Sequence, residues 1–449
     1  MYLPPLSADQ SSIFSTWEYR KSLLRERIGL IDADVVCLQE VSPISFDDDF
    51  AFMFDDLGYD GVELYRKGRF RPATFWKKDR LVLVDTPQHK DRTLLTSFRR
   101  VVDDDDDDDE SSTAAKSISS SNEKEYYWHI LNCHLQAGKQ GGRRLRQIIE
   151  GTNAAIKVAK KHQLQEQHRN DDLVDKIQLI ICGDFNGGQE CGAIRYLESG
   201  SIGPDFLEDG EQVSSKEKIL PIPPLTDAVT NIHRGGEGAL PPPATLVVPE
   251  LISYMIKNRR DDDDGTTTTT AYEDPLFSED VIDRLRRIYS NFATKICDTT
   301  AEMQMGKNDV ERWLTIINQR VGRGTEFRNA AKCMGWVEPI LDTNDEINKD
   351  NRPPIIIPDN GILTLDDFIS VYIDELRQGK FWGIAWDLAS LGEPLPGVNN
   401  VFYARYDRLY ASQSLLPVAV LDTISDKACP NEYEPSDHLP VCASFLPRR

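Results

Sequence analysis

The chain has 449 residues, of which 40% are hydrophobic, and a formal net charge of −22. This length is enough for two domains with sizeable cores, and no apolar stretch reaches the length that crosses a membrane. The negative charge argues at first against a nucleic-acid substrate, because phosphate backbones attract Lys and Arg. Much of that charge lies in two acidic runs, 103–110 and 261–264. These runs are too polar to pack, so we expect solvated loops, including a disordered loop over 103–122.

The eight cysteines contain no Cys-x-x-Cys pair. Four of them, Cys37, Cys133, Cys182 and Cys442, lie inside expected strands, where a free thiol behaves as a small apolar residue. Free buried thiols are typical of a reducing compartment. We therefore expect an intracellular protein, cytoplasmic or nuclear.

Four separated apolar runs, rich in β-branched residues, each end in polar residues suited to phosphate chemistry. In chain order these residues are Glu40, His134, Asp184 with Asn186, and Asp437 with His438. Such runs are typical of strands buried in a sheet. A lone Asp-His or Gly-Asp-x-Asn is usually a turn. Four of these motifs together at strand ends indicate one site.

The residue types fit hydrolysis of a phosphate ester. A hard cation offsets the negative charge of the phosphate, and Glu40 is the expected ligand for Mg²⁺ or Mn²⁺. Asp184 can position or deprotonate a water molecule, while Asn186 donates to a phosphoryl oxygen. His134 and His438 can donate to the developing negative charge.

The motifs resemble those of the endonuclease/exonuclease/phosphatase superfamily. Further segments resemble its carbon-catabolite-repressor-type deadenylase, nocturnin and angel groups: 17–21, 32–41, 134–135 with 144–147, and 406–412. The resemblance covers residues 1–250 and 396–449. It implies a four-layer α/β sandwich, in which two packed mixed β-sheets are flanked by helices.

The resemblance also implies roles for individual residues. Glu40 would hold the metal, and Asp184 and Asn186 would lie at the attacking water and the phosphate. Asp437 and His438 would lie beside the scissile group, and the same resemblance gives Asp407 the role of orienting His438.

One element of the superfamily is missing from this sequence. Members begin with a strand that ends in Asn, ahead of the helix that corresponds to Trp17–Lys21. We expect either a sequence truncated at its start or a protein that lacks a core strand and a site residue.

Basic residues follow His134 closely, and Arg144 and Arg146 are the expected contacts to substrate phosphate. A basic mouth suits a polyanionic ligand. We therefore expect an RNA substrate.

A helical insertion interrupts the strand pattern over residues 272–392. The stretch 277–296 has apolar residues at helical spacing, and Ser278 can cap it. A twelve-residue loop follows, with expected calcium ligands Asp298, Thr300, Glu302 and Asp309. Met303 replaces the usual Gly and Asp309 the usual Glu, so we expect weak Ca²⁺ binding.

The second loop keeps Gly361 and Asp367 but has Pro353–Pro358 in the space of the early ligands. The module resembles an EF-hand pair, and the whole chain resembles the calcium-binding endonuclease/exonuclease/phosphatase proteins. Two interpretations stay open. Either the insertion binds calcium, or it is a degenerate helix-loop-helix pair that serves as a packing surface or as a surface for a protein partner.

We predict three segments: 1–250 and 393–449 as the two parts of the catalytic domain, and 272–392 as an all-α, EF-hand-like insertion. The predicted function is a Mg²⁺-dependent phosphoesterase, of the exoribonuclease or deadenylase type, with calcium modulation as a further expectation. One alternative is a phosphatase or phosphodiesterase acting on a small phosphoester, such as a phosphoinositide or a nucleotide. Another is an inactive calcium-responsive binding protein.

Overall fold

The computed structural model describes residues 16–64, 71–101, 126–166, 176–233, 242–256, 276–297, 300–318, 321, 325–337, 355–396, 400–421 and 423–448. The chain forms two compact units, one from Trp17–Val248 with Tyr403–Arg449 and the other from Pro249–Phe402. The loop expected to be disordered, 103–122, lies outside the described residues. None of the described helices is both long and apolar enough to cross a membrane.

A seven-stranded mixed sheet forms the centre of the first unit. Its order is β13 (Thr226–Asp227), β19 (Asp407–Ala411), β8 (Gln178–Asp184), β7 (Tyr127–His134), β6 (Thr93–Arg100) and β4 (Leu81–Leu83), with β5 (Gln88–Lys90) also paired to β6. Strands β7 and β8 are parallel, and the other pairs are antiparallel. A parallel pair needs a crossover connection. The 26-residue helix α5 (Gly141–Glu166) supplies it.

Shorter strands pack against one face of this sheet. They are β1 (Val35–Val41), β3 (Arg71–Trp76) and β2 (Gly61–Leu64) in one sheet, and β20 (Leu415–Leu421) with β21 (Cys442–Pro447) in another. A buried cluster joins Trp76 of β3 and Leu415 of β20 to Phe98, Ile130 and Ile180 of the large sheet. Strands β14 (Leu246–Pro249) and β18 (Val401–Ala404) form a separate two-stranded ribbon.

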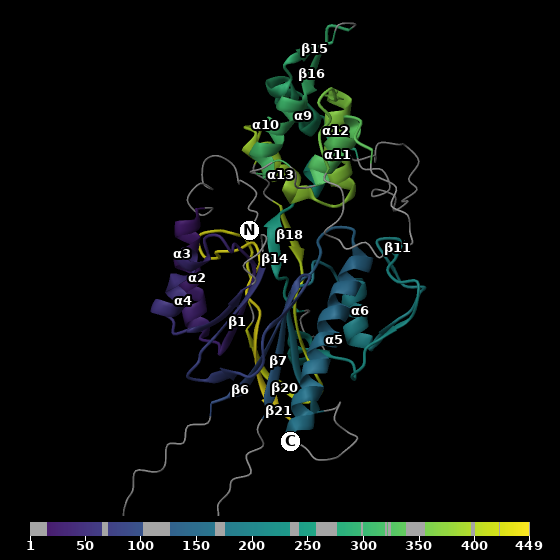
Figure 1. The fold of residues 1–449 in the computed structure, drawn as a ribbon. Helices are drawn as coiled ribbons and strands as arrows, with labels where there is room; N and C mark the ends of the chain where they lie inside the picture. Colours follow the sequence, from purple (N-terminus) through teal and green to yellow (C-terminus); the bar gives the residue numbers. More distant parts are fainter. Residues whose placement is uncertain are drawn as a thin grey trace, which may run out of the picture. The chain divides into compact units, whose positions relative to one another are not determined.

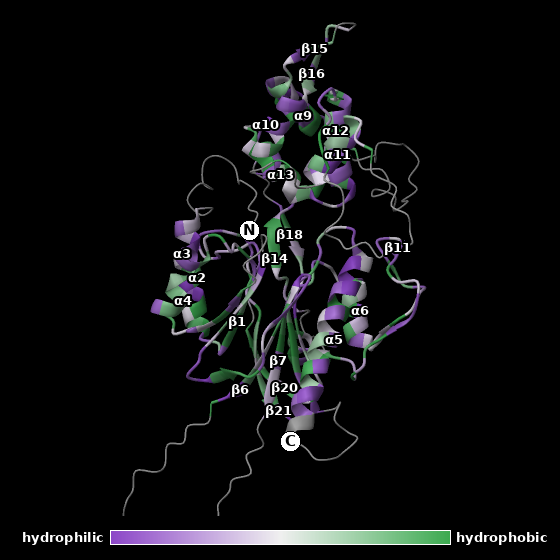
Figure 2. Cartoon of the chain, in the orientation of Figure 1, coloured by the Kyte–Doolittle hydropathy of each residue, from purple (hydrophilic) through white to green (hydrophobic). Residues whose placement is uncertain are grey.

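Helices cover both outer faces of the paired sheets. Helices α2 (Trp17–Ile31), α3 (Phe46–Asp49) and α4 (Ala51–Asp55) pack on the β1 sheet, where Phe46, Met53 and Phe75 are buried together. Helices α5 and α6 (Gly192–Ser199) cover the large sheet (Figure 1). Apolar residues follow the strands, as Figure 2 shows in green. The predicted four-layer α/β sandwich is confirmed.

The first unit also contains several short elements near α6. They are β9 (Ser201–Ile202), β10 (Leu207–Glu208), β11 (Glu211–Gln212), β12 (Lys218–Ile219) and α7 (Ala228–His233).

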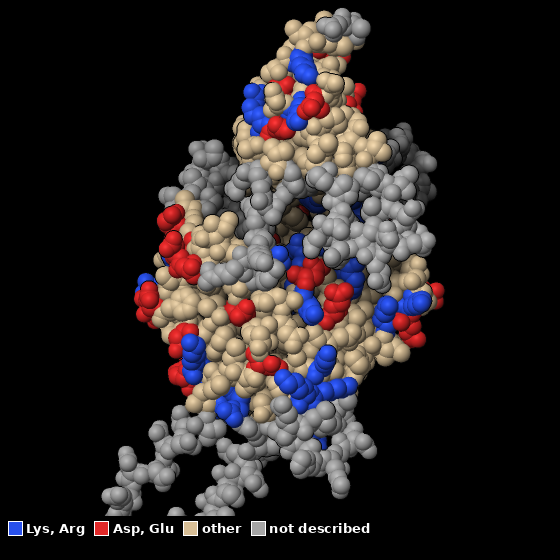
Figure 3. Space-filling view, in the orientation of Figure 1, with Lys and Arg blue, Asp and Glu red and all other residues tan. Residues whose placement is uncertain are grey.

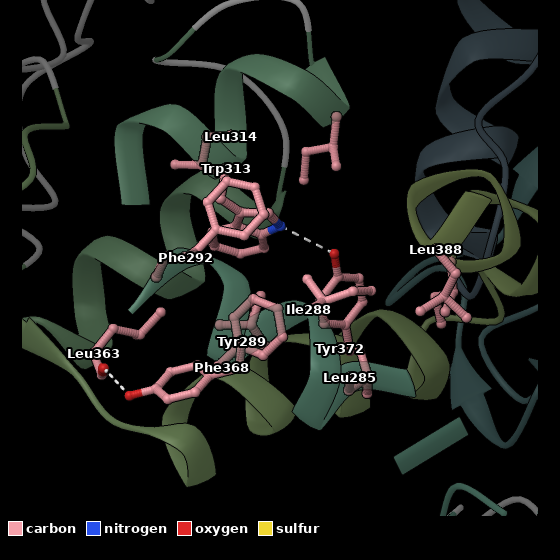
Figure 4. Packing of buried hydrophobic residues seen from close by; sticks show 14 of the residues in the cluster. Leu285, Ile288, Tyr289, Phe292, Trp313, Leu314, Leu363, Phe368, Tyr372 and Leu388 are labelled. Carbon is pink, nitrogen blue, oxygen red and sulfur yellow. Dashed lines mark hydrogen bonds between the residues drawn. The ribbon is translucent and has the colours of Figure 1, made fainter. Parts of the chain in front are cut away.

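The second unit is mainly helical. Its elements are α8 (Ile252–Met255), α9 (Glu279–Phe292), β15 (Lys295–Ile296), β16 (Met303–Gly306), α10 (Lys307–Asn318), α11 (Thr325–Cys333), β17 (Ile362–Leu363), α12 (Leu365–Arg377) and α13 (Phe381–Ser390). Strands β15, β16 and β17 form a three-stranded sheet. The second unit is therefore not the all-α module that we predicted for the insertion. An aromatic core joins the helices, and within it the Trp313 indole donates to the Tyr372 hydroxyl at 3.2 Å (Figure 4).

A buried amide connects the two packed sheets of the first unit. Asn132 on β7 is fully buried and donates from Nδ2 to the carbonyls of Leu38 (3.2 Å) and Ala73 (2.9 Å) across the interface. Its Oδ1 accepts from Nε2 of Gln39 at 2.9 Å. Buried polar groups need such partners, because an unsatisfied group bears the full desolvation cost. This side chain therefore sets how β1 lies on β7.

We expect Asn132→Ala to lower the free energy of unfolding by about 2 kcal/mol or more, since it leaves two carbonyls and the Gln39 amide without their partner. Urea denaturation at equilibrium measures this loss. Asn153→Ala is the control, because Asn153 lies exposed on α5. Its effect should stay within about 0.5 kcal/mol. Equal stability of Asn132→Ala and the parent protein would contradict the bridging role.

Candidate active site

A bulge in β1 aims Glu40 into the site. The pairing of β1 with β3 shifts register between Leu38 and Val41. Glu40 has φ +56°, a left-handed conformation that costs energy for a residue with a side chain. Bulges redirect side chains in this way. The Glu40 Oε1 lies 3.6 Å from Nε2 of His134, at the end of β7.

The end of β8 brings Asp184 to the same place. The preceding residue, Gly183, has φ +125°, and a Cβ there would lie 2.0 Å from the carbonyl oxygen of Cys133. Glycine at this position therefore permits the close approach of β7 and β8. Oδ2 of Asp184 lies 3.7 Å from Nε2 of His134.

Asn186 holds the Asp184 carboxylate. Its backbone N–H donates to Oδ1 of Asp184 at 2.7 Å, and its Nδ2 donates to Oδ2 at 2.8 Å and to the Leu135 carbonyl at 3.0 Å. Both amide hydrogens are thus used within the protein. In the structure this amide positions Asp184, and the contact of Asn186 with a phosphoryl oxygen stays a prediction.

Asp407 and His438 form a tight pair, and the orienting role of Asp407 stays a prediction. The Asp407 Oδ2 lies 2.6 Å from Nδ1 of His438. Burial lowers the pKa of His438, but the charges of Asp407, Asp184 and Asp437 outweigh it and raise this pKa well above its ordinary value. The neighbouring carboxylates therefore favour the protonated form of this imidazole.

Thr245 is a residue of the site that the sequence did not reveal. Its Oγ1 accepts the backbone N–H groups of Tyr406 (3.0 Å) and Asp407 (2.9 Å), which fixes the start of β19. Its carbonyl accepts the N–H of Leu439, directly after His438, at 2.6 Å. Thr245 thus ties both members of the pair to one segment. The only sequence signal is its place at the end of a Pro-Pro-Pro-Ala run.

The two buried groups beside this pair have displaced pKa values. Burial raises the pKa of Asp184 to about 7, although the charge of His438 opposes this. Burial lowers the pKa of His134 to about 4, so this imidazole is neutral. Its Nδ1 has no hydrogen-bond partner among the described residues. The site therefore holds one cationic and one neutral imidazole.

Helix α2 supports the loop that carries Asp437 and His438. Arg20 is buried and donates from Nε to the Pro435 carbonyl at 2.5 Å, and Tyr19 donates to the Glu432 carbonyl at 3.0 Å. Asp437 is partly buried, and burial raises its pKa. Tyr19 and Arg20 thus have a positioning role that their place in the sequence did not indicate.

The carboxylates of the site suit a hard divalent cation. Ligand atoms of Asp184, Asp407 and His438 lie within 4.8 Å of one another, and no other such group of three occurs in the part of the chain that the structure describes. Carboxylate oxygens are the ligands that Mg²⁺ prefers. The raised pKa of Asp184 is also the behaviour of a buried carboxylate that a cation would keep ionised.

Arg144, a predicted contact to substrate phosphate, makes its contacts within the protein. It is buried and pairs with Glu208, with 3.1 Å from its Nε to Oε1, and its Nη1 donates to the Gln136 carbonyl at 2.7 Å. Arg146 is exposed on α5, with Nε 3.9 Å from Oε1 of Glu150. Figure 3 shows basic and acidic side chains interspersed over this face.

The predicted calcium ligands lie in the second unit. Asp298 falls outside the described residues, and Thr300 donates to Oε2 of Glu302 at 3.3 Å. Oδ2 of Asp309 accepts from Oγ1 of Thr294 at 2.8 Å and from the N–H of Gly306 at 3.0 Å. A calcium ion would have to compete with these donors. Calcium binding stays a prediction.

The two predicted loops of the insertion are joined to each other. Met305 pairs with Leu363 in the contact of β16 with β17. Thr364 and Asp367 form a capping box at the start of α12. Asp367 therefore has a structural role in the helix.

Comparison with known proteins identifies the family. A sequence model described as the Endonuclease/Exonuclease/phosphatase family matches residues 11–438. The chain belongs to this family. The resemblance that the strand-end motifs indicated is thereby confirmed.

Individual members of the Endonuclease/Exonuclease/phosphatase family match part of the chain. The CCR4-Not complex 3′-5′-exoribonuclease subunit Ccr4 of Schizosaccharomyces pombe is 28% identical over 231 residues, which cover 43% of this chain and 32% of that protein. The 2′,5′-phosphodiesterase 12 of Mus musculus is 26% identical over 213 residues, 43% of this chain and 33% of that protein. The chain thus spans about a third of the length of these curated relatives.

Among solved structures, that of ANGEL2, a 2′,3′-cyclic phosphatase, with adenosine-2′,3′-vanadate aligns with a TM-score of 0.43 and 14% identity. It covers 98% of this chain and 89% of that one. The similarity to Ccr4 supports the carbon-catabolite-repressor-type branch that the motifs indicated.

We expect Asp407→Asn to lower the pKa of His438 toward the ordinary histidine value of about 6.5, because the main attractive charge is removed. NMR titration of the imidazole in metal-free protein measures this change. An unchanged pKa of His438 would contradict the pairing. Asp205→Asn is the control, since Asp205 is exposed.

The loss of stability caused by the same substitution should depend on pH. The raised pKa of His438 contributes stability that is fully present below about pH 6.5 and is lost as the pH rises through the folded pKa. The lowered pKa of Asp407 contributes stability that is present above about pH 4 and is lost in stronger acid. Asp407→Asn should therefore destabilise the protein more near pH 6 than in strong alkali.

Proposed function

We propose that this chain is a metal-dependent phosphoric ester hydrolase that cleaves phosphodiester bonds. The observation that carries the proposal is the meeting of Asp184, Asp407 and His438 within 4.8 Å at the ends of two sheet strands and a loop. Two carboxylates and a cationic imidazole at one point offer a proton acceptor, a hydrogen-bond donor and a cation site together. Membership of the family supports the same reaction.

Each side chain has a distinct task in this proposal. His438, kept protonated by Asp407, donates to a phosphoryl oxygen as negative charge develops there. Asp184, with its pKa raised to about 7, accepts a proton from the attacking water. Asn186 keeps the Asp184 carboxylate in one orientation.

Glu40 would hold a Mg²⁺ or Mn²⁺ ion, which would offset the charge of the phosphate, while Asp184 is left to accept the proton. His134 lies between these two carboxylates and, being neutral, adds no positive charge to repel the ion. Thr245 and helix α2 hold Asp407, Asp437 and His438 in position.

For the substrate we propose RNA with a free 3′ end, and for the location an intracellular compartment. The names of the relatives, an exoribonuclease subunit and a 2′,5′-phosphodiesterase, support a nucleotide chain. The inward position of Arg144 and the mixed charges on α5 favour the second candidate, a small phosphoester. Calcium modulation and a protein partner at the insertion stay predictions.

We expect Glu40→Gln to abolish Mg²⁺-dependent hydrolysis, because it removes the charged ligand while keeping the shape of the side chain. Asp184→Asn and His438→Ala should each lower turnover by a factor on the order of a hundred, the scale for losing a positioned base or an oxyanion donor. Hydrolysis of a generic phosphodiester is the measurement. Glu26→Gln is the matched control, since Glu26 is exposed on α2. Full activity in Glu40→Gln would refute the metal assignment.

The choice between RNA and a small phosphoester can be decided by incubating the protein with both kinds of substrate in the presence of Mg²⁺. We expect labelled oligoadenylate and random RNA to be shortened from the 3′ end, with no phosphate released from soluble inositol phosphates. The Glu40→Gln protein serves as the blank for contaminating nucleases. Release of inorganic phosphate without shortening of RNA would reject RNA in favour of the small phosphoester.

A further inference from the structure

A basic hollow lies in the first unit, lined in part by residues that are near the catalytic group in the sequence. It is a cavity of about 680 Å³ between α6, α7 and the β13–β19 edge of the large sheet. Its lining includes Gly188, Gln189, Arg195, Asp227, Arg405 and Arg408. No role for these six residues was apparent from the sequence. We call this hollow the Arg195 cavity.

The Arg195 cavity shares chain segments with the catalytic group. Gly188 follows Asn186 by two residues, so the cavity begins within about 7 Å of that residue along the chain. Arg405 and Arg408 flank Asp407. Along β19, successive side chains point to opposite faces, so Arg408 faces the helices while Asp407 faces the other sheet. Tyr410, on the Arg408 face, packs in the cluster that contains α6.

The charges that line the cavity favour an anion. Three guanidinium groups line it against two carboxylates, those of Glu198 and Asp227. Asp227 is already shared: Nη2 of Arg405 donates to its Oδ1 at 2.8 Å, and Nη1 of Arg408 lies 3.6 Å from its Oδ2. The exposed guanidinium of Arg195 forms no ion pair within the described part of the chain.

Of these groups, Arg408 has the greatest need of a compensating negative charge. Its side chain is only 3% exposed, and its Nε has no hydrogen-bond partner among the described residues. Buried cations need compensating charge. A bound anion would supply it.

We propose that the Arg195 cavity binds a phosphate group of the nucleotide chain beyond the scissile bond, an inference that rests on the proposed function. Arginine is suited to this task because its planar fork donates two parallel hydrogen bonds to phosphate oxygens. The cavity is larger than a phosphate alone, and Pro224 and Leu225 line it as well. There is therefore room for the attached sugar or base. The cavity makes the enzyme prefer a chain over a single nucleotide.

Binding can be measured without hydrolysis. Fluorescence anisotropy in EDTA, with labelled oligoadenylates ten and two residues long, gives both dissociation constants. Arg195→Ala should weaken binding of the ten-residue chain about 3- to 10-fold and change binding of the two-residue chain much less. The slope of log affinity against log salt should fall by about 0.7, the value for one lost contact to a single strand.

Two further variants make the result specific. Arg405→Gln should weaken binding of the ten-residue oligoadenylate in the same way. Circular dichroism should show that this variant keeps its fold. Lys157→Ala removes one charge from the exposed face of α5 and should leave both affinities unchanged. Parent-like affinity and salt slope in Arg195→Ala and Arg405→Gln would overturn the inference, and so would equal losses for the two chain lengths.

The outcomes separate the two proposals. Arginine-dependent binding of the longer chain by a protein that cleaves no phosphodiester would support the cavity and reject the proposed function. Cleavage of RNA with parent-like binding in both arginine variants would support the function and reject the cavity.

Discussion

The buried amide of Asn132 is the interaction on which the first unit depends. It is bonded to two carbonyls and one side chain of the opposing sheet, so β1 and β7 cannot slide past each other without leaving these groups unsatisfied. The partner side chain is that of Gln39, next to the strained Glu40. The same amide therefore stabilises the sandwich and supports the bulge that turns Glu40 toward His134.

The protonation states of the site depend on two opposing effects. One is the burial of its side chains, and the other is the strong pair of Asp407 with His438. Asp407 holds His438 in its charged form, and that cation is the main opponent of the burial that raises the pKa of Asp184. His134, buried beside these groups, is neutral instead. Four neighbouring side chains thus give one protonated imidazole, one neutral imidazole and one carboxyl group with a pKa of about 7. A hydrolase working near neutral pH needs these differing protonation states.

Segments far apart in the sequence hold this arrangement in place. Thr245 ties β19 to the loop of His438, while Tyr19 and Arg20 fasten that loop to α2. The insertion has its own core, in which Trp313, Phe368 and Tyr372 pack together. The second unit thus has a core formed by its own residues.

The sequence by itself determined the strands, the order of the motifs and hence the family. A β-branched run predicts a buried strand, and four such runs that each end in an acid or a histidine indicate a shared site. The tasks of Asn186, Arg144 and Thr245 could not be predicted in this way. An amide can donate inward or outward, and an arginine on an amphipathic helix can face either core or solvent by a small rotation. Only the tertiary structure decided these cases, since hydrogen-bond partners such as Glu208 come from distant parts of the chain.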